Sequence, residues 1–322
     1  MKTLLLTDLH FADKPRGLLD AQRECIINII KDEYPDEVII MGDLMMHRKP
    51  SPRVLLSLKY VVDCLKSKGI KLTILRGNHD SDTKADDGIT SLSLFDYHAT
   101  VVTKTWFDHK TKRAFIPHYE NEEYIKECLG SVPKGYTVFG HFGYAGCLNS
   151  VGDADFGINS SLFRNPTYLG HIHRFTQKEN ITVLGTPYTT NFGETENENF
   201  YAILQDGCVE FKQPKTGPRH LLMGYDEVEE NLKFINDPKW FTLLRVMIDA
   251  ESQALAYDKL DVGFLDIKWK PYFEDDEVSD YMPKRDLFTI NEMIIEDYVD
   301  SSKTLIDKDD LMGGYSLIKN ED

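Results

Sequence analysis

The chain has 322 residues, 41% hydrophobic and 28% charged, and a protein of this size and composition can bury a substantial core. No apolar run approaches the roughly 20 residues that a membrane-spanning helix requires, and residues 2–7 are too short an apolar stretch for the core of a signal peptide. The five cysteines are scattered and lack a C-x-x-C spacing, which argues against a thiolate zinc site or a disulfide framework. We therefore expect a cytoplasmic location with no membrane association.

The net charge of -16 is unevenly distributed along the chain. Residues 1–190 contain 23 basic and 23 acidic side chains, whereas residues 191–322 contain 14 and 30. The neutral first part can accommodate metal ions and an anionic substrate. The acidic second part would repel nucleic acid unless its basic residues are grouped on one face. Alternatively, the acidic surface only keeps the protein soluble.

The first 140 residues alternate between strand-like and helix-like patterns. Apolar runs typical of buried strands occupy residues 2–7, 37–41, 71–75 and 136–139. Apolar residues at helical spacing occupy residues 18–31 and 54–66, with Pro52 suited to the start of the second helix. This rhythm predicts parallel strands joined by crossover helices.

Beyond Arg164 the pattern changes to short strand-like runs separated by Gly, Pro and Asn. These runs lie at residues 167–169, 181–184, 199–204 and 208–212. Residues 213–219 contain two prolines and a glycine and are the predicted linker. They would separate a catalytic domain, 1–212, from a smaller α+β domain, 220–285, with strands at 241–248 and 264–269. Residues 274–280 are predicted as an acidic loop, and residues 286–322 as a C-terminal helix, 287–299, followed by a tail.

Five short polar motifs directly follow predicted strands. They are Asp8-Leu9-His10, Gly42-Asp43, Gly77-Asn78-His79-Asp80, Gly140-His141 and Gly170-His171-Ile172-His173. Ligands of open α/β sheets bind outside the carboxyl ends of the strands. We therefore expect all five motifs to meet at one edge, although they span 166 residues of sequence.

The donor types in these motifs predict a site for two metal ions. Carboxylate, imidazole and amide donors together favour Mn²⁺, Fe²⁺ or Zn²⁺ over Ca²⁺, which prefers oxygen alone. Two ions about 3.5–4 Å apart need a shared anionic ligand, and a carboxylate is the natural bridge. Each motif alone is often structural, but five of the ten histidines fall inside the ordered set.

This ordered set resembles the calcineurin-like metallophosphoesterase superfamily. The resemblance implies an α/β fold, a four-layer-type β-sandwich flanked by helices, with a smaller α+β capping domain. It implies two divalent cations, Mn²⁺ foremost with Mg²⁺, Fe²⁺ or Zn²⁺ possible. One ion would be held by Asp8, His10, Asp43 and His173, and the other by Asp43, Asn78, His141 and His171. It further implies that His79 is the catalytic histidine and that Asp80 orients it.

Within this superfamily the chain is similar to the SbcD-type DNA-repair nucleases, especially the short versions of phage recombination nucleases. The similarity lies in residues 42–52, in Leu169–His173, and in the later segments Leu184–Pro187 and Phe192–Glu194. In our interpretation, metal binding does not require Leu184–Pro187 or Phe192–Glu194. The resemblance implies a DNA exonuclease or endonuclease subunit that acts with an SbcC-type ABC ATPase in repair, recombination or phage DNA processing.

One position departs from the family pattern. Many members place a His or Asp three residues after the bridging aspartate, where it helps to handle the DNA end, and here that residue is Met46. His47 could take its place if the loop bulges, or it is a solvated loop residue. Further candidates for DNA contacts lie in loops near the motifs, although each is equally compatible with a solvated loop or an internal salt bridge: Lys14, Arg16, Arg48, Lys49 and Arg76.

No G-x-x-x-x-G-K-[ST] loop is present, so any dependence on ATP must come from a partner. An apolar stripe on the predicted C-terminal helix is a candidate docking face for that ATPase, unless it packs on its own domain: Leu287, Ile290, Ile294, Ile295 and Val299. The resemblance also implies a homodimer through helices of the catalytic domain. The candidate residues for the dimer contact are Leu55, Leu58, Val61 and Val62. Their spacing is also typical of residues in the core.

Two other functions stay open. The chain could be a stand-alone phosphodiesterase or phosphatase that acts on nucleotides or phosphoproteins, although such an enzyme does not need the residues beyond the linker. It could also be a non-catalytic scaffold, but the presence of every expected ligand and of His79 argues against that.

Overall fold

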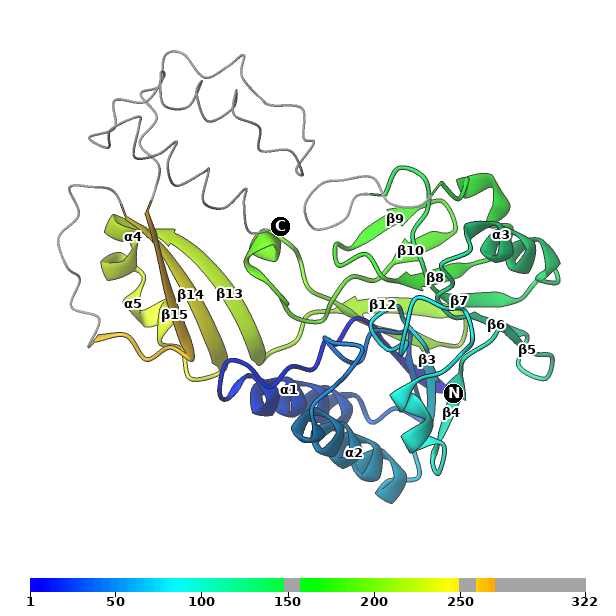
Figure 1. The fold of residues 1–322 in the computed structure, drawn as a ribbon, viewed down its shortest axis with the longest axis horizontal. Helices are drawn as coiled ribbons and strands as arrows, with labels where there is room; N and C mark the ends of the chain where they lie inside the picture. The colour runs from blue at the N-terminus through cyan, green and yellow to red at the C-terminus, as the bar shows by residue number, and fades with distance from the viewer. Residues whose placement is uncertain (148–156, 249–258, 270–322) are drawn as a thin grey trace, which may run out of the picture. The chain divides into compact units, whose positions relative to one another are not determined.

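A computed structural model describes residues 1–147, 157–248 and 259–269 (Figure 1). The chain is divided into two units, residues 1–270 and 271–322. The second unit lies outside the described residues, and with it the predicted loop 274–280, the helix 287–299 and its five docking residues. Within the described part of the chain, no helix is both long and apolar enough to cross a membrane.

The first sheet is built from the predicted alternation of strands and helices. The strands β1 (Lys2–Leu6), β2 (Glu37–Ile40) and β3 (Lys71–Leu75) are parallel and are joined by α1 (Leu18–Glu33) and α2 (Pro52–Ser67). Ser51 caps α2 by accepting a hydrogen bond from the Val54 amide at 3.4 Å, next to Pro52 in the first turn. The sheet is completed by β4 (Ala99–Val102), β11 (Tyr201–Gln205) and β12 (Cys208–Lys212), in the order β12-β11-β1-β2-β3-β4.

The second sheet has the order β5-β6-β7-β8-β10-β9. Its strands are β5 (Trp106–Asp108), β6 (Arg113–Ile116), β7 (Thr137–His141), β8 (Thr167–Gly170), β9 (Thr176–Lys178) and β10 (Ile181–Val183). The helix α3 (Glu122–Ser131) precedes β7, and short 3-10 turns lie at η1 (Ser91–Phe95), η2 (Ser160–Leu162) and η3 (Phe192–Glu194).

Side-chain alternation along the strands places the two sheets between layers of helices. On β1, Leu4 and Leu6 pack with α1 and α2, whereas Leu5 packs between the sheets with Phe115 and Phe139 of the second sheet. On the outer face of the second sheet, apolar side chains pack with those of α3. The predicted four-layer α/β sandwich flanked by helices is therefore confirmed.

A buried carboxylate joins α1 to the first sheet. Glu33 accepts hydrogen bonds from Tyr201 at 2.8 Å, from Lys2 at 2.9 Å and from Lys212 at 3.1 Å. Burial alone would raise the pKa of Glu33, but these hydrogen bonds lower it to about 2. The helix and three strands of the sheet are thus held by a charge that persists at neutral pH.

A third, smaller sheet follows the sandwich. It contains the parallel strands β13 (Gly217–Gly224), β14 (Trp240–Ile248) and β15 (Phe264–Trp269), and the helices α4 (Tyr225–Glu230) and α5 (Leu232–Ile235) lie in its first connection. Residues 217–219, predicted as the end of the linker, are instead the start of β13. The reason is packing: Gly217 lies against Cys25, where an ideal Cβ would be 2.9 Å from its sulfur, and Arg219 is buried.

Of the two interpretations of the apolar residues on α2, dimer contact or core, the structure confirms the core. Leu58, Val61 and Val62 are buried in the core, and Leu55 is partly buried against it. These residues hold the helix on its own sheet because their spacing follows the buried face. Leu56, which is 65% exposed, and Tyr60, which is 59% exposed, are the apolar residues that α2 presents to solvent.

Candidate metal centre

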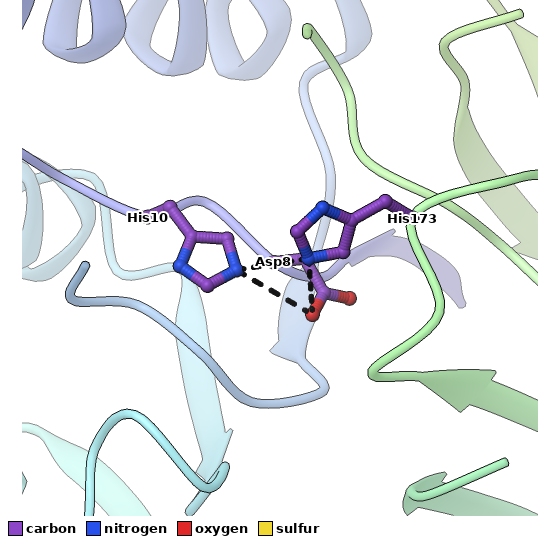
Figure 2. Close-up of side chains that lie close together, drawn as sticks. All are labelled: Asp8, His10 and His173. Carbon is purple, nitrogen blue, oxygen red and sulfur yellow. Dashed lines mark hydrogen bonds and ion pairs between the residues drawn. The ribbon is translucent and has the colours of Figure 1, made fainter. Parts of the chain in front are cut away.

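The ends of the strands bring Asp8, His10 and His173 together, although His10 and His173 are 163 residues apart (Figure 2). The Nε2 atoms of the two histidines face each other at 3.0 Å. The Asp8 carboxylate lies 3.8 Å from Nε2 of His173 and 4.0 Å from Nε2 of His10. Together with Asp43, whose Oδ2 lies 3.7 Å from Nε2 of His10, these residues form the first ligand group.

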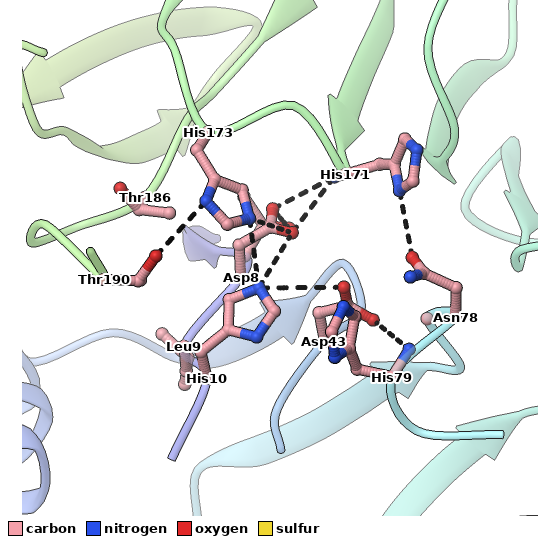
Figure 3. Close-up of polar contacts among 12 residues, drawn as sticks. Asp8, Leu9, His10, Asp43, Asn78, His79, His171, His173, Thr186 and Thr190 are labelled. Carbon is pink, nitrogen blue, oxygen red and sulfur yellow. Dashed lines mark hydrogen bonds and ion pairs between the residues drawn. The ribbon is translucent and has the colours of Figure 1, made fainter. Parts of the chain in front are cut away.

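A second ligand group lies on the other side of Asp43. Nε2 of His141 lies 3.4 Å from Oδ1 of Asp43 and 3.2 Å from Oδ1 of Asn78. The same amide oxygen is 2.9 Å from Nδ1 of His171 (Figure 3). The two carboxylate oxygens of Asp43 thus face different groups, as a bridging ligand requires.

The backbone at these positions is unusual for residues with side chains. The φ angles are 53° at Asp8, 42° at His10, 51° at Asp43 and 83° at His171, all in the left-handed region. Non-glycine residues adopt this region at a cost, and such strain clusters at functional sites. The surrounding structure holds these four residues in this conformation at the two ligand groups.

Gly77 makes a close approach that only glycine allows. An ideal Cβ at this position would lie 2.0 Å from Oδ1 of Asp43 and 2.4 Å from its amide nitrogen. The backbone amide of His79, two residues further along the chain, donates a hydrogen bond to Oδ1 of Asp43 at 2.8 Å. The glycine therefore lets the loop after β3 wrap around the bridging carboxylate.

Two ligand histidines have their second ring nitrogen fixed by hydrogen bonds. Nδ1 of His141 donates to the carbonyl of Met41 at 2.6 Å, and Nδ1 of His173 donates to Oε1 of Glu194 at 2.5 Å. These bonds direct the Nε2 lone pairs into the site, as in other metal centres. Sequence reasoning missed the role of Glu194: it treated residues 192–194 as unnecessary for metal, whereas the buried carboxylate orients a ligand.

The electrostatics of the site favour a bound cation. Burial alone would lower the pKa of His141, but the charge of Asp43 outweighs this effect and raises it to about 9. Burial would raise the pKa of Asp43, but His141 and its neighbours lower it well below the usual value. A buried carboxylate that stays charged among inward-facing imidazole and amide donors fits two divalent cations of intermediate hardness.

His79 lies at the site, but its orienting partner differs from the expected one. A ring nitrogen of His79 is within 4.8 Å of donor atoms of His10 and Asp43. Its Nδ1 donates to the carbonyl of Met46 at 2.6 Å. Asp80 instead accepts hydrogen bonds from the amides of Gly77 at 3.0 Å and Met45 at 3.2 Å. The expectation that Asp80 orients His79 is therefore wrong. The Asp80 carboxylate instead links the loop after β3, through Gly77, to the loop after β2, through Met45.

A further histidine at the site was not found from the sequence. His118 follows β6 and is buried, with its ring centroid 5.6 Å from that of His171 and 6.2 Å from that of His141. Burial lowers its pKa to about 3. The available signal was a polar residue after an apolar run, as in the other motifs, but β6 was not predicted.

The residues expected to contact DNA differ in their exposure to solvent. Lys14, Arg16, His47 and Lys49 are exposed in the loops that follow the ligands. Arg48 is partly buried and lies 3.5 Å from Glu120. Arg76 is only 1% exposed and donates to the carbonyl of His118. Arg76 is thus an internal residue and cannot contact DNA from the surface.

Comparison with known proteins identifies the family. The sequence pattern of the calcineurin-like phosphoesterases matches residues 1–240, and the chain belongs to this family. No curated protein sequence matches the chain. The family and the two ligand groups support a hydrolase of phosphoester bonds that uses two divalent metal ions.

Three solved structures are similar to part of this chain. A nuclease MPE from Pseudomonas putida is 16% identical, with a TM-score of 0.34, over 65% of this chain and 87% of that one. A dimetal phosphatase from Danio rerio is 12% identical, with a TM-score of 0.40, over 66% and 96%. A cold-active protein tyrosine phosphatase is 11% identical, with a TM-score of 0.36, over 66% and 79%. At these identities and scores, the similarities say nothing about the substrate.

Proposed function

We propose that this protein is a metal-dependent DNA nuclease subunit that hydrolyses phosphodiester bonds. The observation that carries the proposal is the bridging position of Asp43, whose two oxygens face two complete ligand groups. The exposed cations Lys14, Arg16 and Lys49 follow the ligand motifs and suit a polyanionic substrate. The similarity of residues 42–52, 169–173, 184–187 and 192–194 to SbcD-type nucleases supports DNA as the substrate.

We also propose an SbcC-type ATPase and a second copy of this chain as partners. The support for the ATPase is the resemblance together with the absence of a P-loop motif from the sequence. On the sandwich, Leu56 and Tyr60 of α2 supply exposed apolar area that suits a second copy.

The residues of this chain have distinct parts in the reaction. Two divalent cations, when bound, provide Lewis acidity and a hydroxide nucleophile near neutral pH. The two ligand groups would hold those cations, and Asp43 is the residue that both groups share. Since Nδ1 of His79 donates to Met46, a protonated His79 presents its Nε2 proton to a phosphoryl oxygen or to the leaving oxygen.

A second candidate is a phosphodiesterase or phosphatase for nucleotides or phosphoproteins. One observation favours it: Arg48 and Arg76, two of the cations expected to bind DNA, make internal contacts instead. A small substrate would need the metal centre and His79 but not an extended basic surface.

Mn²⁺-dependent hydrolysis of end-labelled duplex DNA tests the proposal, with bis-aryl phosphodiester as a minimal substrate. The wild type should degrade DNA, whereas His79→Ala should bind both metal ions and degrade DNA about 100- to 10,000-fold more slowly. Cleavage of the small diester without cleavage of DNA, also after addition of the ATPase partner, would support the second candidate. Two bound ions without cleavage of either substrate would favour a scaffold.

A further inference from the structure

A small apolar cluster joins the three-stranded sheet to the metal centre. We call it the seam, and its members are Ala12, Leu18, Met46, Phe192, Phe241 and Leu243. Phe241 and Leu243 come from β14, Leu18 from α1, and the other three from loops of the sandwich. Leu243 is only 3% exposed, so the contact excludes water.

Each of the three loops in the seam also carries part of the metal centre. Ala12 lies two residues after the ligand His10. Met46 turns its side chain into the seam while its carbonyl accepts the hydrogen bond from His79. Phe192 begins η3, which contains the carboxylate that orients His173. The seam thus lies behind the first ligand group and behind His79.

Phe192 is held by two strands of the small sheet. The guanidinium of Arg245 on β14 lies 4.1 Å from the centre of the Phe192 ring, and the His220 ring of β13 meets it edge-on at 4.8 Å. Arg245 is in turn held by Asp266 of β15, at 2.7 Å from its Nε. In addition, the amide of His220 donates to Oγ1 of Thr189 at 2.7 Å. All three strands therefore contribute to holding the segment before Glu194.

Alternation along β14 separates this contact from the internal core of the sheet. Phe241, Leu243 and Arg245 face the seam and Phe192. Leu244 and Val246 face the opposite way and pack with Val228 of α4 and Ile235 of α5. Two neighbouring leucines, both buried, thus serve different purposes in the same strand.

We propose that the sheet β13–β15 positions the metal centre through the seam, so that its docking sets the affinity of the first ligand group for metal. The inference goes beyond the proposed function and rests only on the two-metal centre. Side chains that lock metal ligands in place contribute strongly to affinity. Coupling between sites is reciprocal, so metal binding should also tighten the seam.

Two variants of the full-length chain test this inference by calorimetric titration with Mn²⁺. Leu243→Ala removes a buried leucine from the seam, and Leu244→Ala removes one from the internal core of the same sheet. We expect Leu243→Ala to weaken one of the two Mn²⁺ sites by tenfold or more, and Leu244→Ala to change both by less than threefold. Mn²⁺ should also slow amide exchange in residues 190–194 and 241–246 of the wild type. Should Leu243→Ala fail to fold, Phe192→Leu keeps an apolar side chain, removes the ring between Arg245 and His220, and should weaken the same site.

The outcomes separate this inference from the proposed function. Equal Mn²⁺ affinity in the wild type and the folded seam variants would overturn the inference, while cleavage of DNA by the wild type would leave the nuclease proposal intact. Equal losses of Mn²⁺ affinity in Leu243→Ala and Leu244→Ala would also overturn the inference. Destabilisation of the whole small sheet would then explain both losses. A wild type that binds none of Mn²⁺, Mg²⁺, Fe²⁺ and Zn²⁺ would refute the metal centre and with it both proposals.

Discussion

Replacement of Glu194 by glutamine removes the charge that orients His173 while keeping the size of the side chain. The buried carboxylate accepts hydrogen bonds from Nδ1 of His173 at 2.5 Å, the amide of Thr190 at 2.6 Å, Oγ1 of Thr190 at 2.8 Å and Nδ2 of Asn191 at 2.5 Å. Glutamine offers one acceptor oxygen and adds an NH₂ group, so at least one buried donor loses its acceptor.

The expected effect on metal binding follows from these contacts. Burial alone would raise the pKa of Glu194, but its hydrogen bond with His173 lowers it, so the native residue is a charged acceptor. Loss of such a partner typically costs 10- to 100-fold in metal affinity. This range corresponds to about 1.4–2.8 kcal/mol. Because the hydrogen bonds of Glu194 lead to His173 alone among the ligands, we expect the loss at the first ligand group only.

Calorimetric titration with Mn²⁺ measures this loss as one weakened and one unchanged binding event. Glu196→Gln, which changes an exposed carboxylate two residues further on, is the matched control and should bind as the wild type does. Unchanged affinity of Glu194→Gln at both sites, or an equal loss at both, would refute the assigned role of Glu194.

Three further predictions follow from the geometry. His79→Ala should keep both Mn²⁺ ions and lose about 100- to 10,000-fold in turnover of bis-aryl phosphodiester, since it removes only an acid; loss of a metal ion in the titration would contradict this. Gly77→Ala should displace Asp43 and abolish binding of both ions, whereas Gly130→Ala, whose Cβ meets no atom within 4 Å, should bind normally. The folded-state pKa of Glu33, about 2, lies below its usual value of 4.5, so its stabilisation is present above pH 4.5 and disappears as the pH falls toward 2. Glu33→Gln should therefore lower the unfolding free energy at neutral pH by about 1 kcal/mol after discounting for solvent screening, and denaturant titrations should show this difference vanish in acid.

The sequence alone predicted the candidate ligands, the first three parallel strands and the two helices that join them. Strand ends are marked by a change from apolar to polar residues, and parallel strands place their carboxyl ends at one edge of their sheet. The sequence therefore predicted that motifs within one sheet meet, whereas the packing of the two sheets brings the motifs after β1, β2 and β3 to those after β7 and β8. The central strands and the helices of the first sheet were predicted in the same way, because a buried strand is a local apolar run and an amphipathic helix has a local period of 3.6. The strands β4, β5, β6 and β9 have only three or four residues each and were missed. The strand β13 was missed because its start was assigned to the linker.

Only the tertiary structure decided which groups support the ligands. The carbonyl of Met46 that holds His79 is a backbone atom, and residue type does not reveal its use. The burial of Arg76 and the bond from Glu194 to His173 depend on contacts between separate loops. The seam, too, exists only because β14 docks on residues more than 190 positions earlier in the chain, such as Met46. Local sequence encodes a residue's chemistry and its place on a strand or helix, whereas its neighbours across the fold are fixed by packing.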